Sequence, residues 1–283
     1  MKITNKLGLP QALVDAVSQR PPSGNYSASM LTKSPRMVQL ARRHSAEMEQ
    51  DVADMIWAIF GTAVHKVIEA ADPEQALSEQ YLKVELSNGA TVSGMADLYE
   101  DGKISDWKTV SVWSYLKLDD EKLHDYEVQL NTYALLFELA GFPVRQLEIV
   151  MLFRDWQRSK AKYDIEYPQH QVQRVPIKLL PAEKTEAYLL ERTNLFESHK
   201  DTPDNELPLC TDAERWARPG KFAVMKKGRK SALRLLDTLE QAEAWKESNG
   251  GDSIDKREGQ SWVRCEYCNA AQFCNQYKEA QID

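Results

Sequence analysis

The chain has 283 residues, 42% of them hydrophobic, and a formal net charge of −7, which suits one large domain or a domain with a smaller appendage. No stretch approaches the roughly 18 consecutive apolar residues of a membrane helix, and the amino terminus lacks the apolar run of a signal peptide, so we expect a cytoplasmic protein without a membrane partner. The acidic balance excludes a protein that coats nucleic acid with its whole surface, because neutralising phosphates requires Lys and Arg. A local basic groove remains compatible with it.

The first part of the chain is predicted to hold an irregular lead-in, a long helical stretch and two strands. Residues 1–33 contain two turn-rich patches and predict no separate domain. Ser34-Pro35 is typical of a helix start, and the apolar spacing from there to about residue 71 predicts mostly helix. Residues 79–100 predict two strands with a turn at Asn88-Gly89.

The next part alternates strands and helices. Asp101-Gly102 predicts a tight hairpin turn, because a type I′ turn needs positive φ at both central residues. The elements expected after it are a strand at 103–110, a helix at 119–140, a strand at 146–155, a second strand within 163–175 and a helix at 181–200. This order predicts an α/β fold with a mixed central sheet flanked by helices.

The hairpin places acidic residues opposite each other. A two-residue turn at 101–102 pairs Asp97 with Asp106, with Cβ atoms about 4.5–5.5 Å apart, and such acids repel unless a cation lies between them. Lys108 emerges on the same face. Carboxylate oxygens suit Mg²⁺ or Mn²⁺, and such an ion activates water for hydrolysis while the lysine stabilises negative charge. The alternative is two exposed acids on a surface hairpin, with Lys108 screening them.

Four short motifs resemble those of one nuclease family. Gly94-Met95-Ala96-Asp97 and Asp106-Trp107-Lys108 resemble the G-x-x-D and D-x-K elements of RecB-type PD-(D/E)XK nucleases. Gly61-Thr62-Ala63-Val64-His65 resembles the family's G-x-x-x-H element, and Gln129-Leu130-Asn131-Thr132-Tyr133 its Q-x-x-x-Y element. The four elements occur in family order over residues 61–133, and a similarity to phage-type exonucleases extends over most of the chain.

The resemblance implies a restriction-endonuclease-like PD-(D/E)XK core, expected over residues 1–200. In it Asp97, Asp106 and the backbone carbonyl of Trp107 would bind the catalytic Mg²⁺ or Mn²⁺, and Lys108 would be the catalytic lysine. His65 would be an additional metal ligand.

Further residues of the implied site have alternatives. Gln129 and Tyr133 would hold the DNA strand, and they share one helix face at i and i+4. Without the family, Tyr133 and His65 are as readily core residues and Gln129 a solvated one. The family often has another acid before Asp97, for which Glu79 or Glu85 is available.

All four cysteines lie near the carboxy terminus, as Cys265-x-x-Cys268-x5-Cys274 and the earlier Cys210. In a reducing cytosol, clustered cysteines more often bind metal than form disulfides. They resemble the cysteines of iron–sulfur nucleases, including the CRISPR adaptation nuclease, and imply a structural [4Fe-4S] cluster. In those proteins the first cysteine precedes the nuclease core, whereas Cys210 follows it. Structural Zn²⁺ is the main alternative, and four unliganded thiols are the other.

A basic hairpin is predicted within the carboxy-terminal segment, residues 201–283, which we expect to pack on the core. Residues 215–236 contain eight Lys or Arg and no acid. The expected turn carries four candidate DNA-binding residues: Lys226, Lys227, Arg229 and Lys230. Such a turn suits a phosphate backbone, with Trp216 or Phe222 stacking on bases. The alternative is a solvated hairpin.

Together these patterns predict a metal-dependent DNA exonuclease of phage-type recombination or DNA processing, located in the bacterial host cytosol. Its expected partners are DNA with a single-stranded end and a recombination protein. The alternatives are a CRISPR-adaptation-type nuclease and a catalytically inactive DNA-binding iron–sulfur protein. The presence of Asp106 and Lys108 counts against an inactive protein.

Overall fold

The computed structural model describes residues 2–18, 25–71 and 77–281. They form an α/β fold around a mixed sheet whose six described strands are β2 (Tyr26–Ser27), β4 (Leu77–Glu85), β5 (Thr91–Glu100), β6 (Lys103–Val110), β7 (Gln146–Phe153) and β8 (Val172–Ile177). The order is β2-β5-β6-β7-β8, with β4 also paired to β5. The β2–β5 and β6–β7 pairs are parallel and the others antiparallel, as predicted for a mixed sheet.

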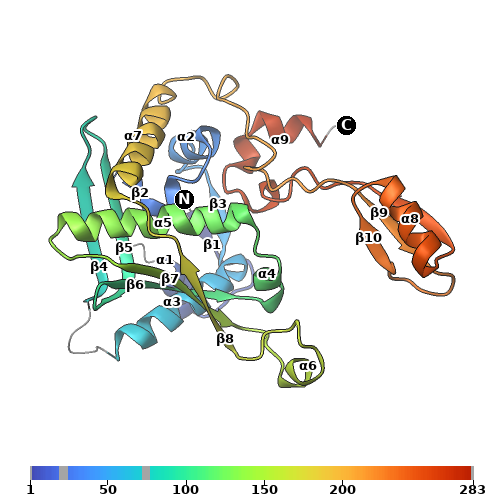
Figure 1. Ribbon diagram of the computed structural model, residues 1–283. Coiled ribbons are helices and arrows are strands. Elements are labelled where there is room, and N and C mark those ends of the chain that lie inside the picture. The colour runs from blue at the N-terminus through green and yellow to red at the C-terminus, as the bar shows by residue number, and fades with distance from the viewer. Residues whose placement is uncertain (1, 19–24, 72–76, 282–283) are drawn as a thin grey trace.

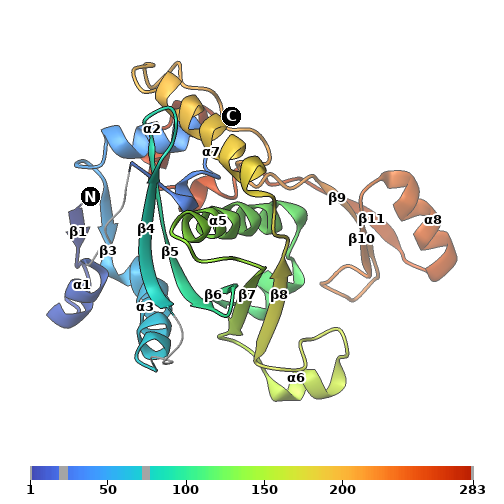
Figure 2. The same cartoon turned by 60° about the vertical axis from the view of Figure 1, so that its left-hand side comes forward.

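Two long helices cover the sheet, and both were predicted from the sequence. Helix α5 (Asp120–Leu139) begins at Asp119, whose side chain accepts a hydrogen bond from the Lys122 N–H, and α7 (Ala182–Ser198) packs on α5. Figure 2 shows α5 lying across the strands with α7 beyond it. One core joins Leu130 and Phe137 of α5 to Ile104 and Ile149 of the sheet. The face of α5 that turns toward the sheet therefore packs across β5, β6 and β7.

The predicted hairpin turn is confirmed. Asp101 and Gly102 have φ values of 49° and 79°, as a type I′ turn requires. Strand β6 has the predicted bounds.

Residues 34–71 are mostly helical, as predicted, but the helical stretch is interrupted because the chain reverses in its middle. Helix α2 (Pro35–Arg43) starts as expected, with the Ser34 side chain accepting from the Met37 N–H. It ends where His44 contacts Glu47 and Asp204. Strand β3 (Glu49–Asp51) then pairs in parallel with β1 (Lys2–Thr4), and α3 (Ile56–Glu69) follows. The partners that break the helix lie far away in sequence.

Two other expectations need correction. The lead-in is not wholly irregular, since it contains β1, α1 (Gln11–Ser18) and β2, and β2 joins the central sheet. The strand expected within 163–175 begins only at Val172, after α6 (Arg158–Tyr163). Helix α4 (Val112–Leu116) was not predicted. Within the described residues, no helix has the length and apolar character needed to cross a membrane.

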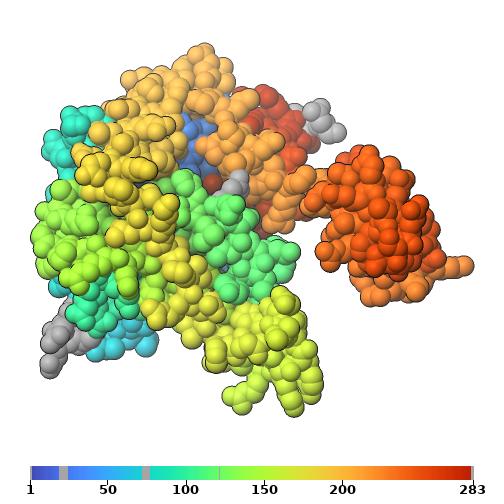
Figure 3. All heavy atoms as spheres, viewed as in Figure 1, coloured from blue at the N-terminus to red at the C-terminus, as the bar shows by residue number. Residues whose placement is uncertain are grey.

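The carboxy-terminal segment divides in space. A three-stranded sheet, in the order β10 (Arg234–Leu236), β9 (Lys221–Met225) and β11 (Ser253–Arg257), forms a small lobe with α8 (Leu239–Asn249). This lobe stands away from the body of the molecule (Figure 1, Figure 3). The cysteine-bearing part, which ends in α9 (Asn275–Glu279), instead returns to the body, where Ala270 and Cys274 pack with Leu40 of α2.

Candidate functional site

The β5–β6 hairpin has the predicted register. Leu98 pairs with Ser105 and Glu100 with Lys103. The ladder ends one pair before Asp97 and Asp106, and there the Asp97 Oδ2 accepts a hydrogen bond of 2.7 Å from the Trp107 N–H. Both acids are buried, with exposed fractions of 8% and 1%. The backbone of β6 therefore holds one carboxylate beside the other.

Three potential metal ligands converge at this end of the hairpin. The Nδ1 atom of His65 on α3 lies 3.1 Å from the Asp97 Oδ1 and 3.4 Å from the Glu79 Oε1 of β4. One ligand atom from each of these residues lies within 4.8 Å of the other two. The hydrogen bond with Asp97 raises the pKa of His65. The three residues come from separate elements, and the carboxylate of Asp106, which pairs with Lys108, lies outside this group.

Glu79 adopts a conformation that is rare for its residue type. Its φ is 50°, in the left-handed region, which costs about 1–3 kcal/mol for a residue with a Cβ. It stands between Ser78 and Gln80, which pair with Leu98 and Ala96, and so lies across from Asp97. The sequence left Glu79 and Glu85 as equal alternatives. Glu85 pairs with Thr91 at the other end of β4, so Glu79 is the acid of this site.

Asp106 forms an ion pair with Lys108, as 2.5 Å separates Oδ2 from Nζ. That oxygen has no well-aligned hydrogen bond within the described residues. Burial raises the pKa of Asp106 to about 6, the Lys108 ammonium opposes this shift and the Asp97 charge adds to it. Burial lowers the pKa of Lys108, but Asp106 outweighs it and keeps that pKa above its usual value. The Lys108 ammonium thus balances the charge of Asp106, and the nearby Asp97 adds a second negative charge.

Helix α5 contributes a polar pair above the carboxylates. The Gln129 Nε2 donates a hydrogen bond of 2.7 Å to the Tyr133 hydroxyl. Tyr133 is buried, and burial together with the charge of Asp106 raises its pKa. A Cβ on Gly94 would lie 2.6 Å from two carbons of the Tyr133 ring. Gly94 is therefore needed for the ring to rest on β5.

The remaining predicted ligand is the backbone carbonyl of Trp107. In an extended strand, the N–H and C=O of one residue point to the same edge. Because the Trp107 N–H reaches Asp97, its carbonyl faces the Asp97 side of β6. Its binding to a metal stays a prediction.

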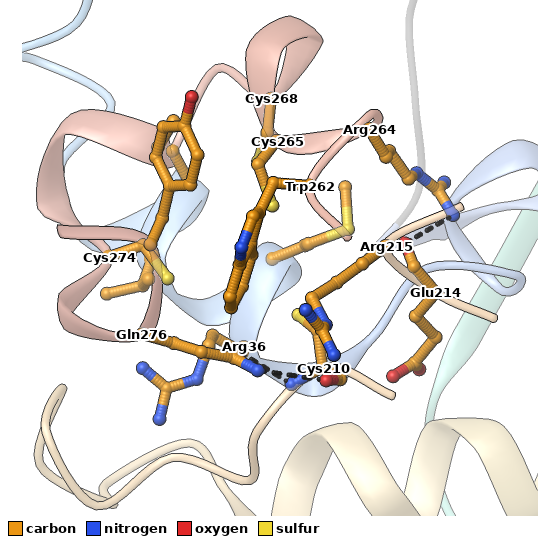
Figure 4. Close-up of a pocket in the computed structure, with 15 residues that line it drawn as sticks. Arg36, Cys210, Glu214, Arg215, Trp262, Arg264, Cys265, Cys268, Cys274 and Gln276 are labelled. Carbon is orange, nitrogen blue, oxygen red and sulfur yellow. Dashed lines mark hydrogen bonds between the residues drawn. The ribbon is translucent and has the colours of Figure 1, made fainter. Parts of the chain in front are cut away.

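The four cysteines surround one pocket, although Cys210 is separated from the others by more than 50 residues. Figure 4 shows their side chains directed into it, beside Arg36 and Arg215. Gln276 fixes Cys210 through two backbone hydrogen bonds, of 2.8 Å from the Cys210 N–H and 2.9 Å to its carbonyl. All four are free thiols. Burial first, and then the neighbouring cysteines, raise the pKa of Cys265 to about 11.

Within the described residues, the one group of three potential ligand atoms found within 4.8 Å of one another is that of His65, Glu79 and Asp97, so the cysteine sulfurs form no such group. Binding of a cluster or of zinc by the four cysteines stays a prediction.

The basic hairpin is confirmed as a hairpin, with Val224 paired to Arg234. Its four predicted DNA-binding residues, Lys226, Lys227, Arg229 and Lys230, are exposed and lie on the small lobe, away from the carboxylate site. Phe222 belongs to the same small sheet. Trp216 lies elsewhere, in a groove beside α4.

Comparisons with known proteins add little. No protein-family model matches the chain, and no curated protein matches it either. One solved structure that it resembles is the crystal structure of SSO0001, with 16% sequence identity, a TM-score of 0.44, and coverage of 66% of this chain and 84% of that one.

Proposed function

We propose that the chain is a metal-dependent deoxyribonuclease with a PD-(D/E)XK core, acting as an exonuclease in DNA processing of the phage recombination type. The observation that carries the proposal is the convergence of His65, Glu79 and Asp97 beside the buried Asp106–Lys108 pair. These residues come from α3 and three strands, and four of the five belong to the motifs that resemble the RecB-type family.

The residues present fit a hard divalent cation. The carboxylate oxygens suit Mg²⁺ and Mn²⁺, and the imidazole nitrogen of His65 favours a transition metal over Mg²⁺, so Mn²⁺ is the better fit of the two. His65, Glu79, Asp97 and Asp106 would hold the ion. When bound, the ion supplies an acidified water and stabilises charge on the scissile phosphate.

The chain's own groups then position the reaction. Lys108 presents an ammonium beside Asp106, where it stabilises the negative charge that grows on the phosphate oxygens. Tyr133 and Gln129, joined by their hydrogen bond, orient the DNA strand above the carboxylates. Gly61 lies one helical turn before His65, and a Cβ there would meet no atom within 4 Å, so a phosphate can approach the α3 backbone closely.

End-labelled linear DNA tests this proposal. We expect degradation with Mn²⁺ and none with EDTA, and a loss of roughly 100-fold or more in Asp106→Asn, because an essential ligand and its charge are removed. Glu100→Gln is the matched control, since Glu100 lies on the same hairpin beside the turn, outside the site. Full activity in Asp106→Asn would refute the proposal. Metal-independent DNA binding without cleavage would instead support an inactive DNA-binding protein.

For the cysteines we propose a structural [4Fe-4S] cluster held by Cys210, Cys265, Cys268 and Cys274. The convergence of the four cysteines on one pocket supports it, and the cationic side chains of Arg36 and Arg215 along the pocket suit the net negative charge of four thiolates. Anaerobically purified protein is expected to be brown and to contain about four irons and four sulfides per chain. A colourless preparation with one zinc per chain would refute the cluster.

A further inference from the structure

A large groove adjoins the carboxylate site. It has a volume of about 900 Å³ and runs between the end of β6, helix α4 and the start of α5 on one side and residues 216–218 and 263–267 on the other. Val110, which lines it, lies two residues after Lys108, and Met151, also in its wall, is the strand neighbour of Lys108. The groove therefore begins beside Lys108, next to the site where the scissile phosphate is expected.

Aromatic rings line both walls of this groove. Trp113 of α4 is 53% exposed and Tyr267 is 74% exposed. Trp216 adds a third ring, held at a φ of 54° that few residues with a Cβ adopt. The Arg218 guanidinium lies 5.8 Å from the centre of the Trp113 ring, so it reaches from one wall to the other. Exposed rings that converge on one groove offer flat faces to a ligand.

The same groove is basic, in contrast to the chain as a whole. Among the described residues, Lys117, Lys122 and Arg218 line it together with one acidic residue, Asp119. The Asp119 carboxylate is engaged as the cap of α5, where it accepts a hydrogen bond from the Lys122 N–H. The chain carries a formal charge of −7, so a local excess of cations beside the catalytic carboxylates selects an anionic ligand.

We propose that this groove binds the single-stranded part of the DNA substrate, with unpaired bases stacked on Trp113 and Tyr267 and phosphates beside Lys117, Lys122 and Arg218. Rings and cations that alternate along a groove are what single-strand binding requires. A duplex hides the faces of its bases within its own stack, so it cannot use the rings. The inference rests on the proposed nuclease function, which it extends by naming the form of the substrate.

The cysteine site acquires a specific role in this arrangement. Tyr267 lies between Cys265 and Cys268, and Val263 of the groove wall is two residues before Cys265. A group held by the cysteines would therefore fix the second wall of the groove opposite α4.

Binding of a fluorescein-labelled oligothymidylate of about 20 nucleotides, followed by anisotropy in EDTA with the full chain, tests the inference. We expect Trp113→Ala and Tyr267→Ala each to weaken binding by roughly 5- to 100-fold. Tyr163→Ala is the matched control, because Tyr163 is 82% exposed on α6 and lies outside the groove; its binding should equal that of the wild type. Melting curves confirm that each variant is folded.

The cationic part of the groove is tested by salt. Lys117→Gln and Lys122→Gln should each reduce the slope of log K against log salt concentration by about 0.7, the value for one phosphate contact on a single strand. Lys162→Gln, on α6, should leave the slope unchanged.

Failure of this inference is distinct from failure of the nuclease proposal. The groove assignment is overturned if the wild type binds a blunt duplex more tightly than the oligothymidylate. It is also overturned if Trp113→Ala and Tyr267→Ala bind the oligothymidylate as tightly as Tyr163→Ala does. Either result would hold even when the wild type cleaves DNA with Mn²⁺. If the ring variants lose binding but no metal supports cleavage, the groove assignment stands and the nuclease proposal fails.

Discussion

Gly94→Ala tests whether Tyr133 is held where the site needs it. A Cβ at this position would lie 2.6 Å from the Tyr133 Cδ1 and Cε1 and 3.1 Å from the Leu136 Cδ1. Tyr133 cannot simply swing aside, because it is buried and its hydroxyl accepts the Gln129 hydrogen bond. Gly94 does not have a positive φ, so the effect of the substitution is one of packing and not of backbone strain.

The expected cost is that of overpacking, about 1–3 kcal/mol. For a chain of this size, each 1 kcal/mol lowers the melting temperature by roughly 2–4 °C, so Gly94→Ala should melt roughly 2–12 °C below the wild type. Displacing the phenol by even a fraction of an ångström also moves the DNA strand. We expect cleavage to fall by about 10- to 100-fold.

Gly61→Ala is the control variant, in which the expected change in stability has the opposite sign. Gly61 lies inside α3, and a Cβ there meets no atom within 4 Å, so alanine should stabilise the helix by about 0.5–1 kcal/mol. The added methyl obstructs the approach of a phosphate, so cleavage should nevertheless decrease. Thermal melting and the end-labelled DNA assay measure both variants. A Gly94→Ala protein with wild-type stability and activity would refute the packing of Tyr133 on β5.

Three further outcomes follow from the structure. The pKa of Asp106 is raised to about 6, and that of His65 is also raised. Both residues must lose their protons to bind an ion, so the half-saturating Mn²⁺ concentration in the cleavage assay should rise at least about tenfold from pH 7 to pH 5. A half-saturating concentration that does not change with pH would contradict these assignments. Because burial raises the pKa of Cys265, its thiol is protonated at pH 7, and binding of iron or zinc should release protons into a weakly buffered solution. Metal binding without proton release would show that the thiols were already ionised. The buried guanidinium of Arg36 donates hydrogen bonds to the carbonyls of Leu207, Pro208 and Asp204. Arg36→Met removes these bonds and should reduce the free energy of unfolding by about 3 kcal/mol, which lowers the melting temperature by roughly 6–12 °C. An unchanged melting curve would exclude this stabilising role.

Local signals were sufficient for the hairpin and for the two long helices. The turn at Asp101 and Gly102 depends on their own backbone preferences, and it fixes the register of every pair up to Leu98–Ser105. The cap at Asp119 likewise sets where α5 begins. These features depend on residues close together in sequence, which is why pattern and turn chemistry predict them.

The features that the sequence left open depend on distant partners. Glu79 and Glu85 lie in the same predicted strand, and only the pairing of β4 with β5 places Glu79 across from Asp97. The break in the predicted helix over residues 34–71 depends on β1 and on Asp204. Each requires contacts that no local pattern encodes.

The aromatic groove was also missed, for the same reason. Trp113 and Arg218 are about a hundred residues apart in sequence and meet only when the cysteine-bearing part folds back over α4. The sequence drew attention instead to the basic hairpin of residues 226–230, which the structure places on the separate small lobe. The one available signal was Trp216, named as a stacking residue but without its partners.

The proposed nuclease activity requires a divalent cation bound between the imidazole of His65 on α3 and the carboxylates of Asp97 and Asp106 on the β5–β6 hairpin. Crystals soaked in Mn²⁺ and measured at a wavelength where manganese scatters anomalously would locate it directly. We predict one strong anomalous peak within about 2.0–2.4 Å of ligand atoms from His65, Glu79, Asp97 and Asp106, absent in crystals of Asp106→Asn. A peak elsewhere, or none at a saturating Mn²⁺ concentration, would contradict the proposed metal centre.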